Sequence, residues 1–184
     1  ARAVDAAERW TEHLVLLGAR PESADTEYGW VVPQTETAET IVSVRAFVEK
    51  PNATDAQRLM TEGALWNTFI TAATGWGLIH AFQRSLPELF HAYMSATEGG
   101  RRGVAAARRV FSALPQREFG RDLLQKDAAM LKLATLPPCG WIDLGTPARL
   151  SAWLGRQSRT DRRTGAGTVV PSASRGPLAA SGRT

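Results

Sequence analysis

Apolar residues along the chain follow two kinds of spacing, one typical of strands and the other typical of helices. Four short apolar or alternating runs, bounded by glycine, proline or polar residues, predict β-strands at residues 13–18, 28–32, 41–48 and 131–136. Between and around them, apolar residues three and four positions apart predict helices at residues 1–12, 54–63, 78–86, 88–93, 104–113, 118–126 and 146–153. Strands interleaved with helices predict an α/β fold.

Composition narrows the class of protein. The chain has 184 residues, of which 43% are hydrophobic, enough for one medium domain with its own core. It has no apolar run long enough to cross a bilayer and no secretory signal at its start. Its one cysteine, Cys139, is expected to be a small buried residue and excludes an internal disulfide, which favours a reducing, cytoplasmic location.

Positive charge is concentrated in the last residues. Residues 155–184 hold six arginines against Asp161, whereas residues 1–154 hold 16 basic and 17 acidic residues. The body therefore lacks the basic patch of a nucleic-acid-binding protein, and no specific nucleic-acid partner is expected. Because the tail is poor in large apolar residues, we expect a body at 1–154 and a disordered basic tail at 155–184.

Glycine and charged residues interrupt two of the predicted strands. In Glu27-Tyr28-Gly29-Trp30 a glycine lets a ligand approach the backbone, although an ordinary glycine bulge fits equally well. In Phe47-Val48-Glu49-Lys50-Pro51 a strand delivers an acid and a base before a proline ends the ladder. A glutamate accepts hydrogen bonds from a polyol and a lysine binds phosphate; an exposed ion pair is the alternative.

Two further polar residues lie among apolar neighbours. Asn67 lies within Ala64-Leu65-Trp66-Asn67-Thr68-Phe69, where its amide needs partners that a sugar hydroxyl or a neighbouring backbone would supply. Asp143 lies within Gly140-Trp141-Ile142-Asp143-Leu144-Gly145-Thr146, just before a predicted helix. Its carboxylate would suit Mg²⁺, or it would cap the helix or accept backbone N–H groups of the turn.

The order and spacing of these motifs resemble a known family. Gly18-Ala19-Arg20-Pro21, then Tyr28-Gly29, Glu49-Lys50-Pro51, Leu65-Trp66-Asn67 and Trp141-Ile142-Asp143-Leu144-Gly145 are similar to the sugar-phosphate nucleotidyltransferases, most of all to their mannose-1-phosphate guanylyltransferase branch. The resemblance covers residues 10–154. One departure is Thr68-Phe69, which stands where that branch has Ser-Gly.

The resemblance implies a fold, a reaction and residue roles. The fold would be part of a mixed-sheet, Rossmann-like nucleotide-diphospho-sugar transferase domain. The reaction would form a nucleotide-sugar, such as GDP-mannose, and pyrophosphate from a nucleoside triphosphate and a sugar 1-phosphate. Tyr28, Gly29, Glu49 and Asn67 would bind the sugar, Lys50 its phosphate, and Asp143 the cofactor Mg²⁺. Lys50 and Asp143 would thus be the catalytic pair.

The same resemblance predicts an incomplete enzyme. We find no Gly-rich loop with Arg and Lys for the triphosphate in residues 1–184, so we expect a truncated, inactive C-terminal half of the catalytic domain. A catalytically inactive sugar-phosphate-binding or regulatory module of the same lineage is the alternative. Such a half would expose a sheet edge and an apolar face, and association into a homo-oligomer is left open.

Overall fold

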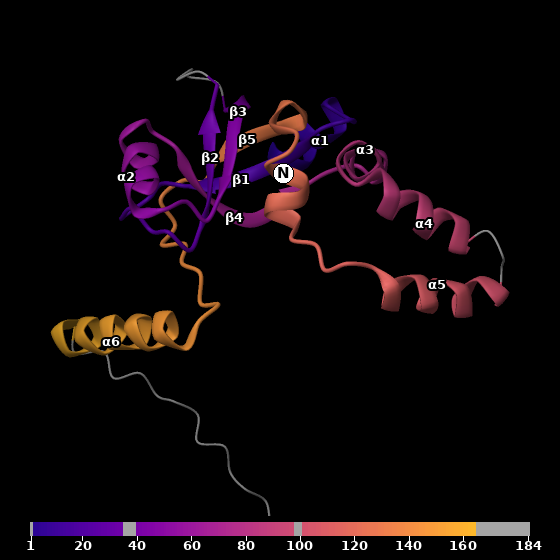
Figure 1. The fold of residues 1–184 in the computed structure, drawn as a ribbon. Coiled ribbons are helices and arrows are strands. Elements are labelled where there is room, and N and C mark those ends of the chain that lie inside the picture. Colours follow the sequence, from indigo (N-terminus) through magenta and orange to yellow (C-terminus); the bar gives the residue numbers. More distant parts are fainter. Residues whose placement is uncertain (1, 35–39, 98–100, 165–184) are drawn as a thin grey trace, which may run out of the picture. The chain divides into compact units, whose positions relative to one another are not determined.

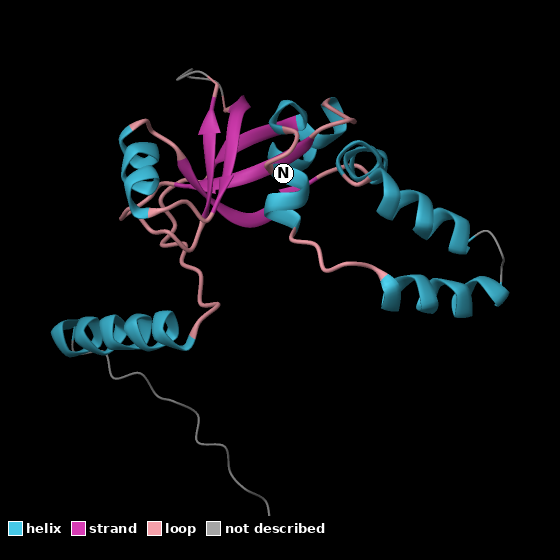
Figure 2. Ribbon diagram, in the orientation of Figure 1, coloured by secondary structure: helices cyan, strands magenta, loops and turns pink. Residues whose placement is uncertain are grey.

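The structure is a computed structural model that describes residues 2–34, 40–97 and 101–164. It consists of two units, Ala1–Trp141 and Ile142–Thr184, which are described here one at a time. The first unit contains every strand in the described residues, together with the helices that surround them (Figure 2). Helices and a mixed sheet in one unit confirm the α/β fold class that the sequence predicts.

The five described strands form a sheet that closes on itself in the order β1-β4-β2-β3-β5. Their bounds are β1 Leu14–Ala19, β2 Gly29–Pro33, β3 Ile41–Glu49, β4 Leu65–Ala72 and β5 Leu131–Thr135 (Figure 1). Strands β1 and β5 pair in parallel, and the other neighbours are antiparallel. Each of these strands thus has a partner on both sides, so the prediction of an exposed sheet edge is wrong.

Strand β4 is the element that the sequence reading missed. It pairs with β1 and β2, and its register with β1 shifts between Leu16 and Gly18. The irregularity lies at Thr68 and Phe69, where Phe69 has φ +60°, a left-handed conformation that favours glycine. The bulge interrupts the alternation of apolar residues by which a strand is recognised, which explains why the pattern gave no strand here.

The first unit also contains helices, only some of which lie against the strands (Figure 1). They are α1 Arg2–Arg9, α2 Ala53–Thr61, α3 Gly75–Ser85, α4 Pro87–Thr97 and α5 Arg101–Ala113, followed by the π-helical turn η1 Gly120–Leu124 and the 3-10 turn η2 Ala128–Met130. Asn52 caps α2 by accepting the N–H of Asp55 at 2.9 Å. Residues 118–126, predicted as an ordinary helix, contain η1 instead.

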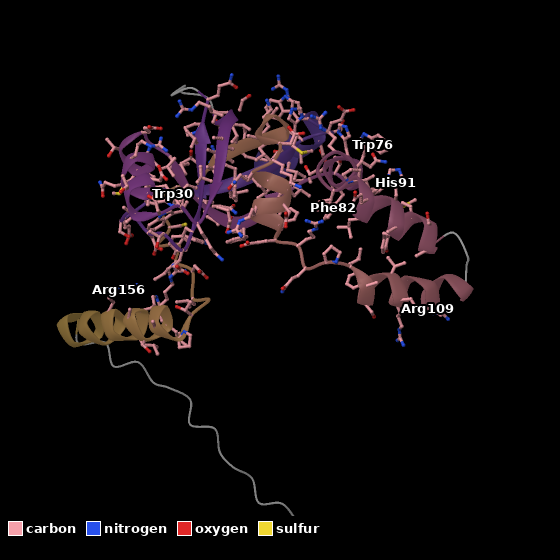
Figure 3. All side chains as sticks on the ribbon, in the orientation of Figure 1. Trp30, Trp76, Phe82, His91, Arg109 and Arg156 are labelled. Carbon is pink, nitrogen blue, oxygen red and sulfur yellow. The ribbon has the colours of Figure 1, made fainter. Side chains whose placement is uncertain are left out.

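The two larger of three apolar cores lie on opposite faces of the strands. The inner core contains alternate strand residues such as Leu16, Val31, Phe47 and Leu65, together with Leu123 and Leu124 of η1. The outer core packs Tyr28, Trp30 and Trp66 against Ala56 and Leu59 of α2. Trp30 is fully buried there, and Figure 3 shows it beside the strands next to α2. This two-faced burial holds the strands that carry the polar motifs.

The second unit contains α6, Pro147–Thr164. Thr146 caps it by accepting the N–H of Arg149 at 3.2 Å. The helix runs past residue 154, so residues 155–164, which composition placed in a disordered tail, are helical. Residues 165–184 of that predicted tail lie outside the described residues.

The structure bears on two expectations from composition, one about a membrane-spanning segment and one about the burial of Cys139. No helix in the part of the chain that the structure describes is long and apolar enough to cross a membrane. Cys139, expected to be buried, is exposed, so that prediction is wrong. It lies in the loop that follows β5 and belongs to none of the apolar clusters.

Candidate functional site

Three of the residues that the sequence singled out lie in one row across neighbouring strands. Glu49, the last residue of β3, pairs with Gly29, the first residue of β2. Trp30 pairs with Trp66, so one step along this register Gly29 lies opposite Asn67 of β4. Because residues directly opposite in a sheet share a face, Glu49, Gly29 and Asn67 point to the same side as the inner core.

Gly18 extends this row onto β1, where it pairs with Asn67. A Cβ on Gly18 would lie 2.8 Å from a methyl group of Leu65, and one on Gly29 would lie 2.8 Å from Oε2 of Glu49. Neither position has room for a side chain. The row therefore alternates two polar residues with two glycines, which lets a carboxylate and an amide pack closely on the inner face.

The two polar side chains are buried but not fully satisfied. Glu49 is 7% exposed and Asn67 is 1% exposed. Oδ1 of Asn67 accepts the N–H of Phe69 at 3.2 Å, whereas neither Nδ2 of Asn67 nor Oε2 of Glu49 has a partner among the described residues. A buried polar atom without a hydrogen bond costs about 1–3 kcal/mol, so a donor and an acceptor left unpaired on one face favour a site for a polar ligand.

The electrostatics of Glu49 reflect this burial. Burial raises the pKa of its carboxyl above the ordinary value, and the nearby carboxylate of Glu118 raises the pKa further. The positive charges of Lys50 and Arg121 act in the opposite direction. Glu49 thus lies near two opposite charges and one like charge, and two of the three come from residues far from it in sequence.

Lys50 leaves the strand in an unusual conformation. Its φ is +47°, in the left-handed region, and its N–H donates to the carbonyl of Tyr28 at 3.2 Å. Its Nζ lies 3.3 Å from Oε1 of Glu118. The turn ends the strand so that the ammonium group meets the segment that leads into η1 rather than continuing along the sheet, and it brings the predicted phosphate-binding cation next to Glu49.

The segment around η1 contributes residues that sequence reasoning missed. A Cβ on Gly120 would overlap Oε2 of Glu49, so this glycine forms one wall around the carboxylate. The side chain of Gln125 accepts the backbone N–H of Glu49 at 2.8 Å. No sequence signal marks these contacts, because Gln125 lies 76 positions after Glu49. A π-helical turn, a form frequent at functional sites, brings them together.

Tyr28 occupies a different place from the other predicted residues. As the neighbour of Gly29 it belongs to the outer core, and its ring lies 4.7 Å from that of Trp66 and 5.8 Å from that of Trp141. A cavity of about 210 Å³ lies nearby, lined by residues 19–22 and 136–141. Ala19, which lines this cavity, pairs with Trp66 and lies on the opposite face of the sheet from Gly18 and the polar row.

Asp143 belongs to the second unit, so the structure does not join it to the row. Its Oδ1 accepts the N–H of Gly145 at 2.8 Å and its Oδ2 accepts Nη1 of Arg149 at 2.6 Å. These are the contacts of a carboxylate that organises the turn before α6. Carboxylate oxygen is also the donor type that Mg²⁺ favours, but the metal would have to displace Arg149. The described residues contain no group of three or more His, Cys, Asp or Glu arranged for a metal.

Sequence comparison matches this chain to a protein family and to individual known proteins. Residues 1–154 match the sequence profile of the Nucleotidyl transferase family. The chain is 28% identical over 139 residues to the "Xanthan biosynthesis protein XanB" of Xanthomonas campestris pv. campestris strain B100, covering 72% of this chain and 28% of that protein. It is 26% identical over 153 residues to a mannose-1-phosphate guanylyltransferase of Klebsiella pneumoniae, covering 78% of this chain and 32% of the relative.

Solved structures show the same fold. A crystal structure described as a mannose-1-phosphate geranyltransferase from Thermus thermophilus superposes with a TM-score of 0.61 at 25% identity, covering 73% of this chain and 37% of that one. A mannose-6-phosphate isomerase from Helicobacter pylori has the same TM-score at 18% identity, covering 77% of this chain and 56% of that one, and supports the fold alone.

The share of each protein that these matches cover decides how much can be concluded from them. The chain spans about a third of the length of the curated relatives it matches. The profile nevertheless covers most of the chain, including the β2, β3 and β4 segments that carry the polar row. This chain belongs to the Nucleotidyl transferase family.

Proposed function

We propose that this chain binds a sugar 1-phosphate, such as mannose 1-phosphate, as the acceptor side of a nucleotidyltransferase that forms a nucleotide-sugar. The observation that carries the proposal is the polar row, in which Glu49 and Asn67 each keep one buried polar atom unpaired beside Gly29. A sugar has neighbouring hydroxyl groups that both donate and accept, so it would satisfy Oε2 of Glu49 and Nδ2 of Asn67 together.

Lys50 would bind the phosphate of the same ligand. It follows Glu49 directly, and its left-handed backbone turns it out of the strand. An ammonium group provides the compact positive charge that a phosphate needs, and a charge-assisted hydrogen bond is worth roughly twice a neutral one. Tyr28 would act indirectly, because its ring packs with Trp66 and Trp141 beside the cavity.

In the complete reaction, an oxygen of the sugar 1-phosphate attacks the α-phosphorus of GTP or another nucleoside triphosphate. The bond from that phosphorus to the bridging oxygen breaks, and pyrophosphate leaves. Such a transfer depends on positioning and charge neutralisation, which Glu49, Asn67 and Lys50 would provide for the acceptor. Mg²⁺, when bound, would neutralise charge on the reacting phosphates, with Asp143 as its protein ligand.

We also propose that residues 1–184 by themselves bind the sugar phosphate without making a nucleotide-sugar. The support is the sequence, in which no Gly-rich loop with Arg and Lys for the triphosphate is present. Incubation with GTP, mannose 1-phosphate and Mg²⁺ is therefore expected to yield no pyrophosphate. Measurable pyrophosphate release would refute this part of the proposal and leave the binding site intact.

Calorimetry tests the binding site directly. Mannose 1-phosphate is expected to bind the wild-type chain more tightly than inorganic phosphate does. Asn67→Ala should remove most of that preference and leave the affinity for inorganic phosphate unchanged, whereas Lys50→Ala should weaken both ligands several-fold. Gln57→Ala, on the exposed face of α2, is the matched control. Equal affinities for mannose 1-phosphate and phosphate in the wild type would overturn the sugar-binding part of the proposed function.

A further inference from the structure

Two cations near Glu49 converge on a single carboxylate. Nζ of Lys50 lies 3.3 Å from Oε1 of Glu118, and Nη1 of Arg121 lies 3.5 Å from its Oε2. Lys50 comes from the end of β3, whereas Glu118 and Arg121 flank the start of η1. A planar anion with oxygens on both sides is thus held between an ammonium and a guanidinium, an arrangement that phosphate also favours.

We propose that Arg121 is a second phosphate-binding residue of this chain and that Glu118 is an internal counter-ion occupying the place of the phosphate until the ligand displaces it. The inference rests on the proposed phosphate role of Lys50. It adds a residue that no sequence motif marks and a carboxylate that competes with the ligand.

The two ion pairs of Glu118 differ from ordinary surface contacts because they lie next to the buried Glu49. The carboxylate of Glu118 and the guanidinium of Arg121 both act on the charge of Glu49, so both lie at the buried carboxylate rather than away from it. Gly120, between them in sequence, approaches Oε2 of Glu49 so closely that no side chain fits there. The backbone that carries Glu118 and Arg121 therefore packs directly against the proposed sugar-binding residue.

The energetics make Glu118 displaceable. The side chains of Lys50 and Glu118 are 46% and 38% exposed, and that of Arg121 is 58% exposed. Exposed ion pairs of this kind contribute little to stability, because water screens the charges and two long side chains lose freedom. A phosphate dianion carries more charge and more acceptor oxygens than a carboxylate, so it would replace Glu118 between the same two cations at a small energetic penalty.

The chain offers a matched control in α2. Glu62 is also held by two cations, with Nη2 of Arg45 at 3.0 Å and Nη1 of Arg58 at 2.9 Å. Its charge and its partners resemble those of Glu118. It caps the end of α2, however, and Glu49 is not among the groups that shift its pKa. Removing its charge therefore releases Arg45, and leaves Arg58 paired with Asp55 at 3.2 Å, without opening the proposed phosphate site.

Calorimetric titration with inorganic phosphate tests the inference in the full chain. Glu118→Gln is expected to tighten phosphate binding about fivefold, which corresponds to about 1 kcal/mol. Adding Arg121→Gln to Glu118→Gln should reverse this gain, and Glu62→Gln should change nothing. Glu118→Ala serves as a second variant, and urea unfolding of each variant verifies that it folds.

The outcomes separate this inference from the proposed function. Unchanged phosphate affinity in both Glu118 variants, or an equal gain in Glu62→Gln, would overturn the inference even if mannose 1-phosphate is still preferred through Asn67. Conversely, a gain specific to Glu118 that depends on Arg121 supports the inference even if mannose 1-phosphate binds no better than phosphate. In that case only the sugar part of the proposed function fails.

Discussion

Phe69 has a backbone conformation that is unfavourable for any residue with a Cβ, so we predict which of two substitutions there gives the more stable protein. The residue has φ +60° in the bulge of β4, and its side chain is 61% exposed. The bulge also orients Asn67, because Phe69 donates its N–H to Oδ1 of that side chain at 3.2 Å. Replacing Phe69 by alanine and by glycine separates the backbone effect from the loss of the ring, since both variants remove the ring.

The expected difference follows from two opposing terms. A residue with a Cβ in the left-handed region costs about 1–2 kcal/mol relative to glycine. Glycine in turn loses more backbone freedom on folding, by about 0.5–1 kcal/mol. Phe69→Gly is therefore expected to be more stable than Phe69→Ala, by up to about 1.5 kcal/mol.

Ile70 provides the control one residue further along β4. It is 49% exposed and is not among the described non-glycine residues with positive φ. Only the second term applies there, so Ile70→Gly should be less stable than Ile70→Ala, by about 0.5–1 kcal/mol. The sign of the glycine-minus-alanine difference thus reverses between the two neighbouring positions.

Urea unfolding followed by tryptophan fluorescence measures these differences. The four variants need equal slopes with urea, so that the midpoints report stability rather than a change in the unfolded state. If Phe69→Ala is as stable as Phe69→Gly, or more so, the left-handed conformation at this position is not a source of strain. The account of the bulge would then be wrong.

Three further predictions concern Glu49 and Asp143. Gly120→Ala should weaken mannose 1-phosphate binding, because a Cβ there would overlap Oε2 of Glu49, whereas Gly75→Ala, with nothing within 4 Å, should bind normally; equal affinities would contradict the packing. The pKa of Glu49 is raised above its ordinary 4.5, because the folded protein disfavours the ionised carboxyl. The wild type should therefore lose stability relative to Glu49→Gln as pH rises through and above that value. Parallel profiles of urea midpoint against pH in the two proteins would refute this. Arg149→Gln should strengthen, and Asp143→Asn weaken, the Mg²⁺ affinity measured by calorimetry with mannose 1-phosphate present; an unchanged affinity in Asp143→Asn would remove that residue from the metal site.

Local sequence patterns predicted most elements because their causes are local. The alternation in residues 41–48 corresponds to β3, and the helix predicted at residues 146–153 corresponds to the first part of α6. Strand β4 was missed because its bulge at Phe69 breaks the period of two that marks a strand. Cys139 was misjudged because a small apolar residue in a loop has no period that reports its burial.

The residues of the candidate site also fall into those that the sequence indicated and those that only the structure revealed. Gly29, Glu49 and Asn67 stand out in the sequence because each interrupts an apolar element, and the strand register confirms that they share a face. That Glu49 and Asn67 bind a sugar stays a prediction. Gly120 and Gln125 did not stand out, since a glycine and a glutamine at a helical spacing look like ordinary surface residues until the fold brings them to Glu49.

The sequence alone determined the fold class, the family and the strand that leads to Glu49 and Lys50. These depend on periodicity, on turn residues and on the order of short motifs, all of which are properties of the chain itself. The closure of the sheet and the meeting of η1 with Glu49 were decided only by the tertiary structure. The packing that joins β3 to residues near 120 depends on the combined burial of many side chains, and no segment carries that information by itself.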